Sequence, residues 1–471
     1  MHCGRHRAAF RWRPVRLAAL LFGAAAVLPA AEPAVAGDQS PVDEPAANGA
    51  AAETAYDPLR GLRPDGSIPR ITMPADIVHP RRWRYVPAGR LKPGNLLQRL
   101  LVTSFITPTF FVEEDVGVGG GVGITDIDFR NQSRREFLGF WASYSTEGQQ
   151  NFKAVWSRAL AHRALPDGGA IWEERSELRA ELGYGKTLTR RFFGFGADSP
   201  AAAETSYTDE ISVADIGIRR GLPEPGADLI GSLGAAYVHH NLAPGRVSAV
   251  PSTEERYPQL IVDGDSHDAV WLRAGLVYDR RDSQQQPYRG WSIGGRVDAA
   301  PLQSHGATGL LLHLGATAAL PVPSFFHDGG AADEENPPTD TINCGAFVRS
   351  TIGELPFYNL PSLGGGSTLR SYVQNRFSDR SAWHASIEWR TWPIPRGVAI
   401  TDSIRIERIG LAYFLDLGSV ADDLGALPEA TVQYSYGAGI RLAFERTAVF
   451  RLDYGISHDS RSFTATFGLT F

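Results

Sequence analysis

One arginine in this sequence follows three consecutive glycines in a segment that can bring it against carboxylates elsewhere in the chain. The segment reads Leu363-Gly364-Gly365-Gly366-Ser367-Thr368-Leu369-Arg370-Ser371-Tyr372. Glycine supplies the backbone freedom that a sharp turn needs. A guanidinium is a planar fork that bonds a carboxylate through two N–H groups, which lysine cannot reproduce. The segment therefore predicts a loop whose arginine can be fixed by an acid.

Two acids, Glu388 and Asp416, lie in later segments where apolar and polar residues alternate. Successive side chains of a β-strand point to opposite faces, so residues of one parity share a face. On this basis one polar face carries Ser386, Glu388 and Arg390, and a second carries Phe414, Asp416 and Gly418. If the loop reached these faces, Arg370 would find the carboxylates of Asp416 and Glu388 there. The alternative is that Arg370 is a solvated loop residue and Asp416 one polar wall residue among many.

Long alternating strands are needed to build such a wall, and the C-terminal region contains them. Residues 432–444, 448–457 and 463–471 alternate with period two over about ten residues, the span of a tilted membrane strand. Strands of soluble sandwiches usually run about five or six residues. In hydrocarbon the backbone must be paired internally, so without a spanning helix a closed barrel is required. Residues 102–471 are predicted to form an all-β, transmembrane antiparallel barrel.

The predicted last strand carries Phe467, Leu469 and Phe471 on one face and ends at the aromatic Phe471. This pattern resembles the closing strand that barrel-assembly machinery reads in outer-membrane proteins. We therefore expect that machinery to insert the chain, and we expect outer-membrane lipid and lipopolysaccharide to surround it.

The N-terminus has the pattern of a secretory signal peptide. Five arginines precede an apolar stretch at residues 17–28, and Ala34-Val35-Ala36 follows. A membrane anchor is the alternative, but a bilayer span needs about 20 apolar residues. Cleavage after residue 36 leaves 41 basic and 51 acidic residues, and this net charge of −10 argues against nucleic acid as a partner. Cleavage also removes Cys3, so Cys344 remains alone and no intrachain disulfide can form.

Two segments separate the predicted signal peptide from the predicted barrel. Residues 37–79 are rich in Ala, Pro, Glu and Asp, which predicts a disordered periplasmic tail. Residues 80–101 mix basic residues with Trp83, Tyr85, Leu96, Leu97 and Leu100, and could hold a short amphipathic helix. This segment is either a lead-in packed against the barrel rim or a plug in the lumen.

Three motifs in residues 100–471 resemble the bacterial surface antigen superfamily of outer-membrane barrels, whose members include the BamA and TamA assembly factors and the two-partner-secretion translocators. The glycine-rich segment with Arg376-Phe377-Ser378-Asp379 and Glu388-Trp389-Arg390 resembles the family's signature loop and following strand. Phe414-Leu415-Asp416-Leu417-Gly418 looks like its Phe-x-Asp-x-Gly strand. Asp279, Arg281, Asp282, Pro287 and Gly290 fit its Asp-x-Arg-Asp hairpin.

The resemblance implies a barrel of sixteen strands with a long extracellular loop that folds into the lumen. It also implies that the tip arginine of this loop, here Arg370, bonds the strand carboxylate, here Asp416. Two departures stand out. Ser371 replaces the glycine that usually follows the arginine, so a Cβ could demand a different backbone angle. Residues 37–97 also hold too few apolar residues and too many prolines for a POTRA domain, the periplasmic module that receives substrate proteins in this family.

The sequence therefore predicts a cell outer-membrane barrel in outer-membrane biogenesis or in protein or lipid translocation, without catalysis, with an unidentified periplasmic partner. A weak seam between the first and last strands, or a lumen gated by the Arg370 loop, would be the working part. The alternative is a passive channel or structural barrel whose loop restricts the pore. An outer-membrane lipase has no motif in the sequence, and no cofactor or metal site is expected, because His239-His240 lacks spaced partner ligands.

Overall fold

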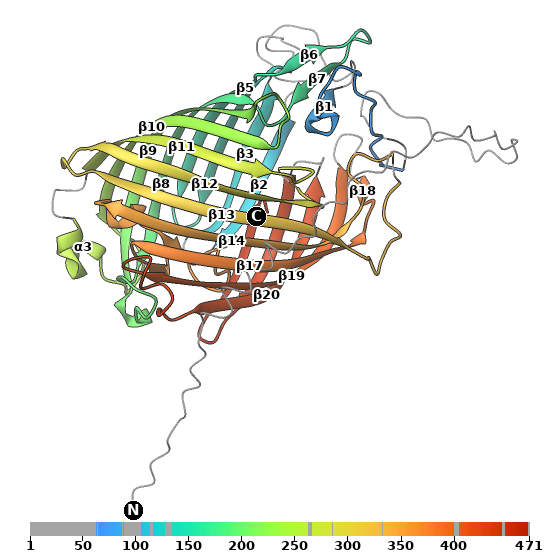
Figure 1. Ribbon diagram of the computed structural model, residues 1–471. Coiled ribbons are helices and arrows are strands. Elements are labelled where there is room, and N and C mark those ends of the chain that lie inside the picture. Colours follow the sequence, from blue (N-terminus) through green and yellow to red (C-terminus); the bar gives the residue numbers. More distant parts are fainter. Residues whose placement is uncertain are drawn as a thin grey trace, which may run out of the picture.

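The computed structural model describes residues 63, 65–86, 88, 105–113, 116–127, 134–261, 266–284, 286–331, 333–399, 405–444 and 448–469. Within these residues, sixteen antiparallel strands form a closed barrel (Figure 1). The strands are β2 (Phe105–Glu113), β3 (Gly117–Ile127), β4 (Glu136–Ser145), β5 (Gln150–Ala159), β8 (Glu177–Phe192), β9 (Thr205–Leu222), β10 (Leu229–Pro244), β11 (Ser266–Asp279), β12 (Gly290–Gln303), β13 (Gly309–Val322), β14 (Asp340–Gly353), β17 (Ser381–Ile394), β19 (Arg405–Ala421), β20 (Gln433–Phe444), β21 (Ala448–Ile456) and β22 (Arg461–Phe467). The predicted all-β fold class is confirmed. The predicted signal peptide and Phe471 lie outside the described residues.

Short elements occupy the two ends of the barrel. One end carries η1 (Pro80–Arg82), β1 (Trp83–Val86), β6 (His162–Ala164), β7 (Ala170–Glu173) and β18 (Val398–Ala399). The connections at the other end hold η3 (Ala201–Ala203), α3 (Thr253–Arg256), η4 (Pro258–Leu260), η5 (Phe357–Asn359), β15 (Ser362–Leu363) and β16 (Phe377–Ser378). Figure 1 shows β1, β6 and β7 at the end opposite α3, and we call the two ends the β1 end and the α3 end. No helix among the described residues has the length and apolar character to cross a membrane.

The two faces of the barrel wall differ as the alternation predicts. Along β19, Tyr413 and Leu415 are 46% and 40% exposed, whereas Phe414 and Asp416 are 5% and 0% exposed. Apolar side chains thus cover the outer face, and the polar ones between them point inward, as in transmembrane β-barrels.

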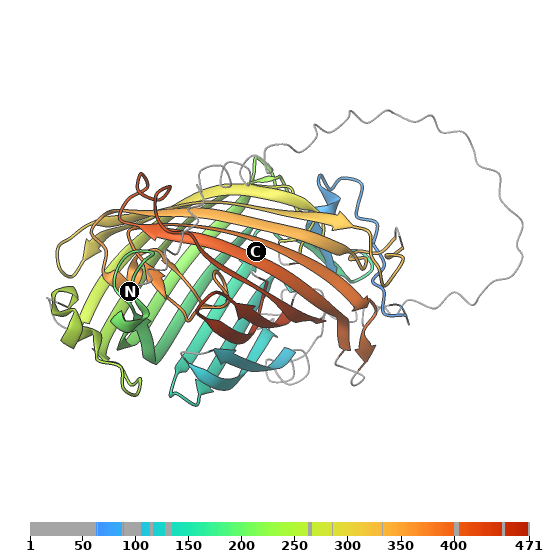
Figure 2. The same ribbon diagram turned by 90° about the horizontal axis from the view of Figure 1, so that it is seen from below.

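The barrel closes between its first and last strands, β2 and β22. Figure 2 shows the red C-terminal strands beside the cyan strands β2 and β3. Among the described residues, the β2–β22 ladder consists of the single register pair Val112–Ala465. The neighbouring β21–β22 ladder runs without interruption from the pair Phe450–Phe467 to the pair Ile456–Arg461. The closure is therefore the least paired junction of the described wall.

The predicted tail ends earlier than His79. Residues 67–70 lie along the β13–β14 connection, where Arg70 N donates to Asp333 O at 2.6 Å and Glu335 N donates to Ile68 O at 2.9 Å. The prediction of a disordered tail was based on its low content of apolar residues. Backbone hydrogen bonds to the β13–β14 connection order this segment instead. Residues 80–86 form η1 and β1 instead of the predicted helix, and β1 pairs with β7. A luminal plug stays a prediction, since residues 89–104 lie outside the described ones.

The C-terminal segment departs from the predicted alternation at Leu469. Gly468 has a φ of +97° and ends β22, a conformation that glycine adopts without strain. Leu469 then packs with the inward-facing Trp392 and Val449 instead of lying on the lipid face. Phe467 stays on the outer face, where its ring centroid is 5.0 Å from that of Phe450.

Candidate functional site

The connection between β14 and β17, residues 354–380, has its own small core. Leu363, Leu369, Tyr372 and Phe377 pack together with Val420 of β19. Two glycines shape the turn that precedes Arg370: Gly364 has a φ of +119° and Gly365 a φ of +80°. Thr368 Oγ1 accepts a hydrogen bond from Gly364 N at 2.8 Å and donates one to Gly364 O at 3.0 Å. The signature segment is thus a rigid turn that presents Arg370 to the wall.

Arg370 is fully buried against β19, β17 and β21. Its Nε donates to Asp416 Oδ2 at 3.0 Å and its Nη2 to Asp416 Oδ1 at 2.9 Å, which is the expected two-point contact. Its Nη1 donates to Glu388 Oε2 at 2.6 Å. The guanidinium carbon lies 3.4 Å from the centroid of the Phe414 ring, a cation–π arrangement. The structure therefore brings together Arg370, Asp416, Glu388 and Phe414, the residues predicted to meet.

Further hydrogen bonds fix the carboxylates. Ser386 Oγ donates to Asp416 Oδ1 at 2.7 Å, and Ser435 Oγ donates to Asp416 Oδ2 at 2.9 Å. Glu388 also accepts from Arg390 Nε at 2.6 Å and from Arg441 Nη2 at 3.0 Å. A buried charge is tolerated only when it is paired and hydrogen-bonded. Each carboxylate oxygen of Asp416 and Glu388 accepts at least one hydrogen bond.

Three more charged residues belong to the network and were missed by sequence reasoning. Arg441 Nη1 donates to Asp453 Oδ1 at 2.6 Å, and Arg451 Nη1 donates to Asp453 Oδ2 at 3.2 Å. Alternation alone puts these side chains on the inner face of β20 and β21. The contact of Arg441 with Glu388, two strands away, and with Asp453 on the next strand depends on strand register, which alternation does not define. We call the set Arg370, Glu388, Arg390, Asp416, Arg441, Arg451 and Asp453 the loop lock.

Close backbone approaches bring the loop onto the wall. A Cβ on Gly455 of β21 would lie 2.6 Å from the carbonyl carbon and oxygen of Arg370, and one on Gly418 would lie 2.8 Å from Leu363 Cδ1. A Cβ on Gly366 would lie 2.8 Å from Thr464 Cγ2. Ser371, which replaces the usual glycine, is not among the residues with positive φ, so its Cβ introduces no backbone strain.

The predicted hairpin motif lies at the β1 end, between β11 and β12. Asp279 is fully buried and accepts hydrogen bonds from Arg281 N at 2.9 Å and Arg281 Nε at 3.1 Å. Asp282 Oδ1 accepts from the backbone N of Ser283, Tyr288 and Arg289. Gly290 has a φ of +105°, and a Cβ there would lie 2.3 Å from Arg280 O. The motif therefore shapes the turn and does not touch Arg370.

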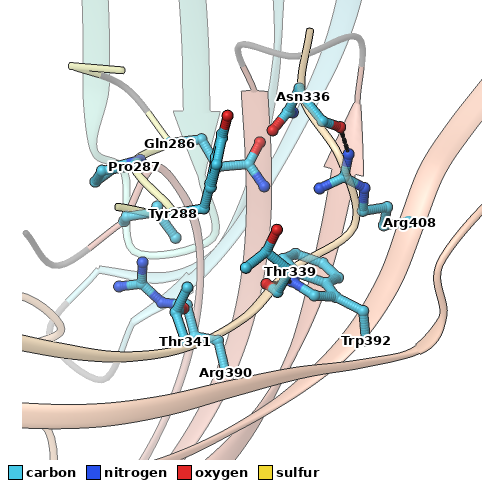
Figure 3. A pocket seen from close by; sticks show the side chains of 10 residues that line it. Gln286, Pro287, Tyr288, Asn336, Thr339, Thr341, Arg390, Trp392 and Arg408 are labelled. Atoms are coloured by element: carbon cyan, nitrogen blue, oxygen red, sulfur yellow. Dashed lines mark hydrogen bonds between the residues drawn. The ribbon is translucent and has the colours of Figure 1, made fainter. Parts of the chain in front are cut away.

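A small pocket lies where this hairpin meets the opposite wall (Figure 3). Gln286, Pro287 and Tyr288 of the hairpin line one side. Arg390 and Trp392 of β17 and Arg408 of β19 line the other, with Thr339, Thr341, Asn336 and Leu469 completing it. Arg390 also bonds Glu388, so this one side chain connects the pocket to the loop lock. Sequence reasoning did not predict that Pro287 and strand β17 line one pocket.

No group of three His, Cys, Asp or Glu side chains in the described part of the chain is arranged to hold a metal ion. The neighbours His239 and His240 illustrate why, since they alternate across strand β10. His239 Nδ1 contacts Asp268 on the outer face, and His240 Nδ1 contacts Asp209 on the inner face.

A closed antiparallel wall with an apolar exterior and an ionic interior defines a transmembrane β-barrel of the outer-membrane type. The sequence profile of the Omp85 superfamily domain matches residues 95–471. The chain therefore belongs to the Omp85 superfamily, and the resemblance found in the sequence is confirmed. No curated protein sequence matches the chain.

Solved structures of three outer-membrane proteins are similar to this chain. BamA from Haemophilus ducreyi lacking POTRA domains 1–3 is 16% identical, with 78% of this chain and 70% of that chain covered and a TM-score of 0.49. CdiB from Acinetobacter baumannii is 13% identical; the match covers 78% of this chain and 59% of that chain, with a TM-score of 0.44. CdiB from Escherichia coli is 12% identical, with 77% and 62% covered and a TM-score of 0.48. The chain thus spans less than two thirds of each CdiB chain.

Proposed function

We propose that this protein acts in outer-membrane biogenesis or in protein or lipid translocation, without catalysis, by opening the seam between β2 and β22. The observation that carries the proposal is the contrast between the two contacts. Arg370 of the loop makes buried ion pairs with Glu388 of β17, Asp416 of β19 and Asp453 of β21, whereas the β2–β22 ladder has one register pair among the described residues. The loop lock stiffens the wall on one side of the β2–β22 junction, so the barrel is expected to open first at this weakly paired junction.

The proposal includes the surroundings of the barrel. The chain reaches the outer membrane after cleavage of its signal peptide, is inserted by the barrel-assembly machinery, and contacts lipid and lipopolysaccharide through its apolar exterior. An unidentified periplasmic partner delivers the substrate.

A cysteine bridge across the seam tests this proposal. Val112→Cys with Ala465→Cys joins β2 to β22 when oxidised, whereas Leu452→Cys with Ala465→Cys joins β21 to β22, which are already paired. Both pairs go into a strain depleted of the native protein, with Cys344 replaced by serine. We expect oxidation of the first pair alone to reduce the levels of other outer-membrane barrels or lipids. Unchanged levels on depletion would contradict the biogenesis role.

A passive channel is the second candidate, and one observation favours it. The inward side chains of Arg179 and Arg296 are 45% and 54% exposed, so water reaches part of the lumen. Single-channel recording in planar bilayers separates the two candidates. A steady open pore supports the channel, and a mostly closed, flickering one supports the gated barrel.

A further inference from the structure

The wall from β8 to β14 lies on one side of the loop lock, where β14 pairs with β17, and presents basic side chains to water. The side chains of Arg219, Arg273 and Arg296 are 37%, 36% and 54% exposed. Those of Arg370 and Arg441 in the loop lock are 0% and 1% exposed. The interior of the barrel therefore has a filled side and a wet side.

Strand register places the basic residues of the wet side in two adjacent rows. The first row crosses the strands in the order Arg219, Ser232, Gly275, Arg296, His313, Arg349. The second row reads Arg179, Gly217, Gly234, Arg273, Asp298. Gly217, Gly234 and Gly275 contribute no side chains to these rows. We call these two rows the arginine wall.

The ion pairs of the arginine wall present their positive members to solvent. In each pair the base is more exposed than the acid: 54% against 10% for Arg296 and Asp298, and 37% against 27% for Arg219 and Glu177. The fractions are 45% against 22% for Arg179 and Glu181, and 36% against 20% for Arg273 and Asp215. A solute in the lumen therefore meets guanidinium groups before it meets carboxylates.

Arg349 adds a cation that no described carboxylate neutralises within ion-pair distance. Its Nε donates to His313 Nδ1 at 3.1 Å, and its guanidinium carbon lies 4.4 Å from the centroid of the Phe347 ring. Because His313 Nδ1 accepts this bond, the neutral ring carries its proton on Nε2, which is a further donor. Arg296, His313 and Arg349 are register neighbours, so three donor groups stand side by side.

We propose that the arginine wall is an anion-binding surface, centred on Arg296, His313 and Arg349, for small phosphate- or carboxylate-bearing solutes dissolved in the lumen. Arginine forks match phosphate and carboxylate oxygens, and rings of basic side chains select anions in other pores. The ligand is a dissolved anion and not a lipid headgroup, because the outer face of the same strands carries the apolar side chains, such as Ile293 and Leu314. This proposal goes beyond the translocation role and does not depend on it.

Titration of the detergent-solubilised full chain with inorganic pyrophosphate tests the proposal. At about 10 mM salt the screening length is about 30 Å, which keeps the interaction strong. We expect saturable binding by calorimetry, and a loss of affinity of about tenfold or more in the double variant Arg296→Gln with Arg349→Gln, because each charge-assisted hydrogen bond contributes at about this level. The single variant Arg349→Gln, which separates no ion pair, serves if the double variant does not fold.

Arg220→Gln is the matched control. Arg220 is adjacent to Arg219 in β9 but lies exposed on the outer face, so the variant loses the same charge without changing the lumen. An absence of saturable binding, an unchanged affinity in the Arg349 variants, or an equal loss in the Arg220 control would overturn the proposal. Competition by phosphatidylglycerol added to the micelles would also overturn it, because it would assign the site to a lipid headgroup.

Discussion

Arg370 and Asp416 make a two-point contact: Nε lies 3.0 Å from one carboxylate oxygen and Nη2 lies 2.9 Å from the other. Both side chains are fully buried, and 46 positions separate them in the sequence. The pair therefore connects the β14–β17 connection directly to strand β19.

Removal of either partner leaves a buried charge without its counterpart. Arg370→Ala and Asp416→Ala are each expected to lower the free energy of unfolding by about 3 to 5 kcal/mol. The double variant Arg370→Ala with Asp416→Ala is expected to be no less stable than either single variant, since neither charge remains. Urea unfolding of the four proteins in detergent measures the coupling, and additive losses would show that the two side chains do not interact.

Glu388 connects three arginines, so its neutralisation is expected to affect more than the loop. Glu388→Gln keeps the side-chain volume but removes the charge that faces Arg370, Arg390 and Arg441. We expect a loss of about 3 kcal/mol or more, as for other broken buried ion pairs. Glu181→Gln is the control, since Glu181 also contacts two bases on the inner wall but is 22% exposed. An equal loss in both variants would mean that burial does not determine the effect.

The close approach of the loop to β21 gives a steric prediction. A Cβ on Gly455 would lie 2.6 Å from the backbone of Arg370, while a Cβ on Gly183, also an inward strand glycine, would have its nearest neighbour at 3.9 Å. Gly455→Ala is expected to cost about 2 kcal/mol and to make the Arg370 segment accessible to proteases, whereas Gly183→Ala is expected to be neutral. A protected loop in Gly455→Ala would contradict the placement of Arg370 above β21.

Alternation in the sequence was sufficient to predict the barrel and the inward orientation of Phe414, Asp416 and Glu388, whereas the number of strands came from the family resemblance. The resemblance of the Arg370 segment to the family's signature loop then predicted the contact with Asp416, and the planar guanidinium fork explained its chemistry. Alternation could not predict that Arg441 and Asp453 join Glu388, because partners across strands depend on register, which one sequence does not reveal. Nor could it predict Leu469, whose side chain turns inward because Gly468 leaves the strand conformation. Residues 67–70 were missed because backbone pairing, not apolar content, orders them.

The hairpin at the β1 end gives a pH-dependent prediction. Burial raises the pKa of Asp282 from 3.8 to about 6, despite the backbone N–H groups that bond its Oδ1, and its Oδ2 is buried with no hydrogen-bond partner among the described residues. Because the pKa is higher in the folded protein than in the unfolded chain, the group favours folding below pH 3.8. That contribution is lost as the pH rises through about 6, and it amounts to roughly 3 kcal/mol.

Asp282→Asn is expected to remove this dependence. The amide oxygen can still accept from the backbone of Ser283, Tyr288 and Arg289, and no charge remains to be buried. The variant should therefore be more stable than the native protein above pH 6 and nearly equal to it below pH 4, where the native carboxyl is protonated. Melting temperatures of the two proteins across this range measure the difference. If the melting temperatures of the two proteins changed in parallel with pH, Asp282 would have its ordinary pKa. Its carboxylate would then be solvated and not buried in the turn.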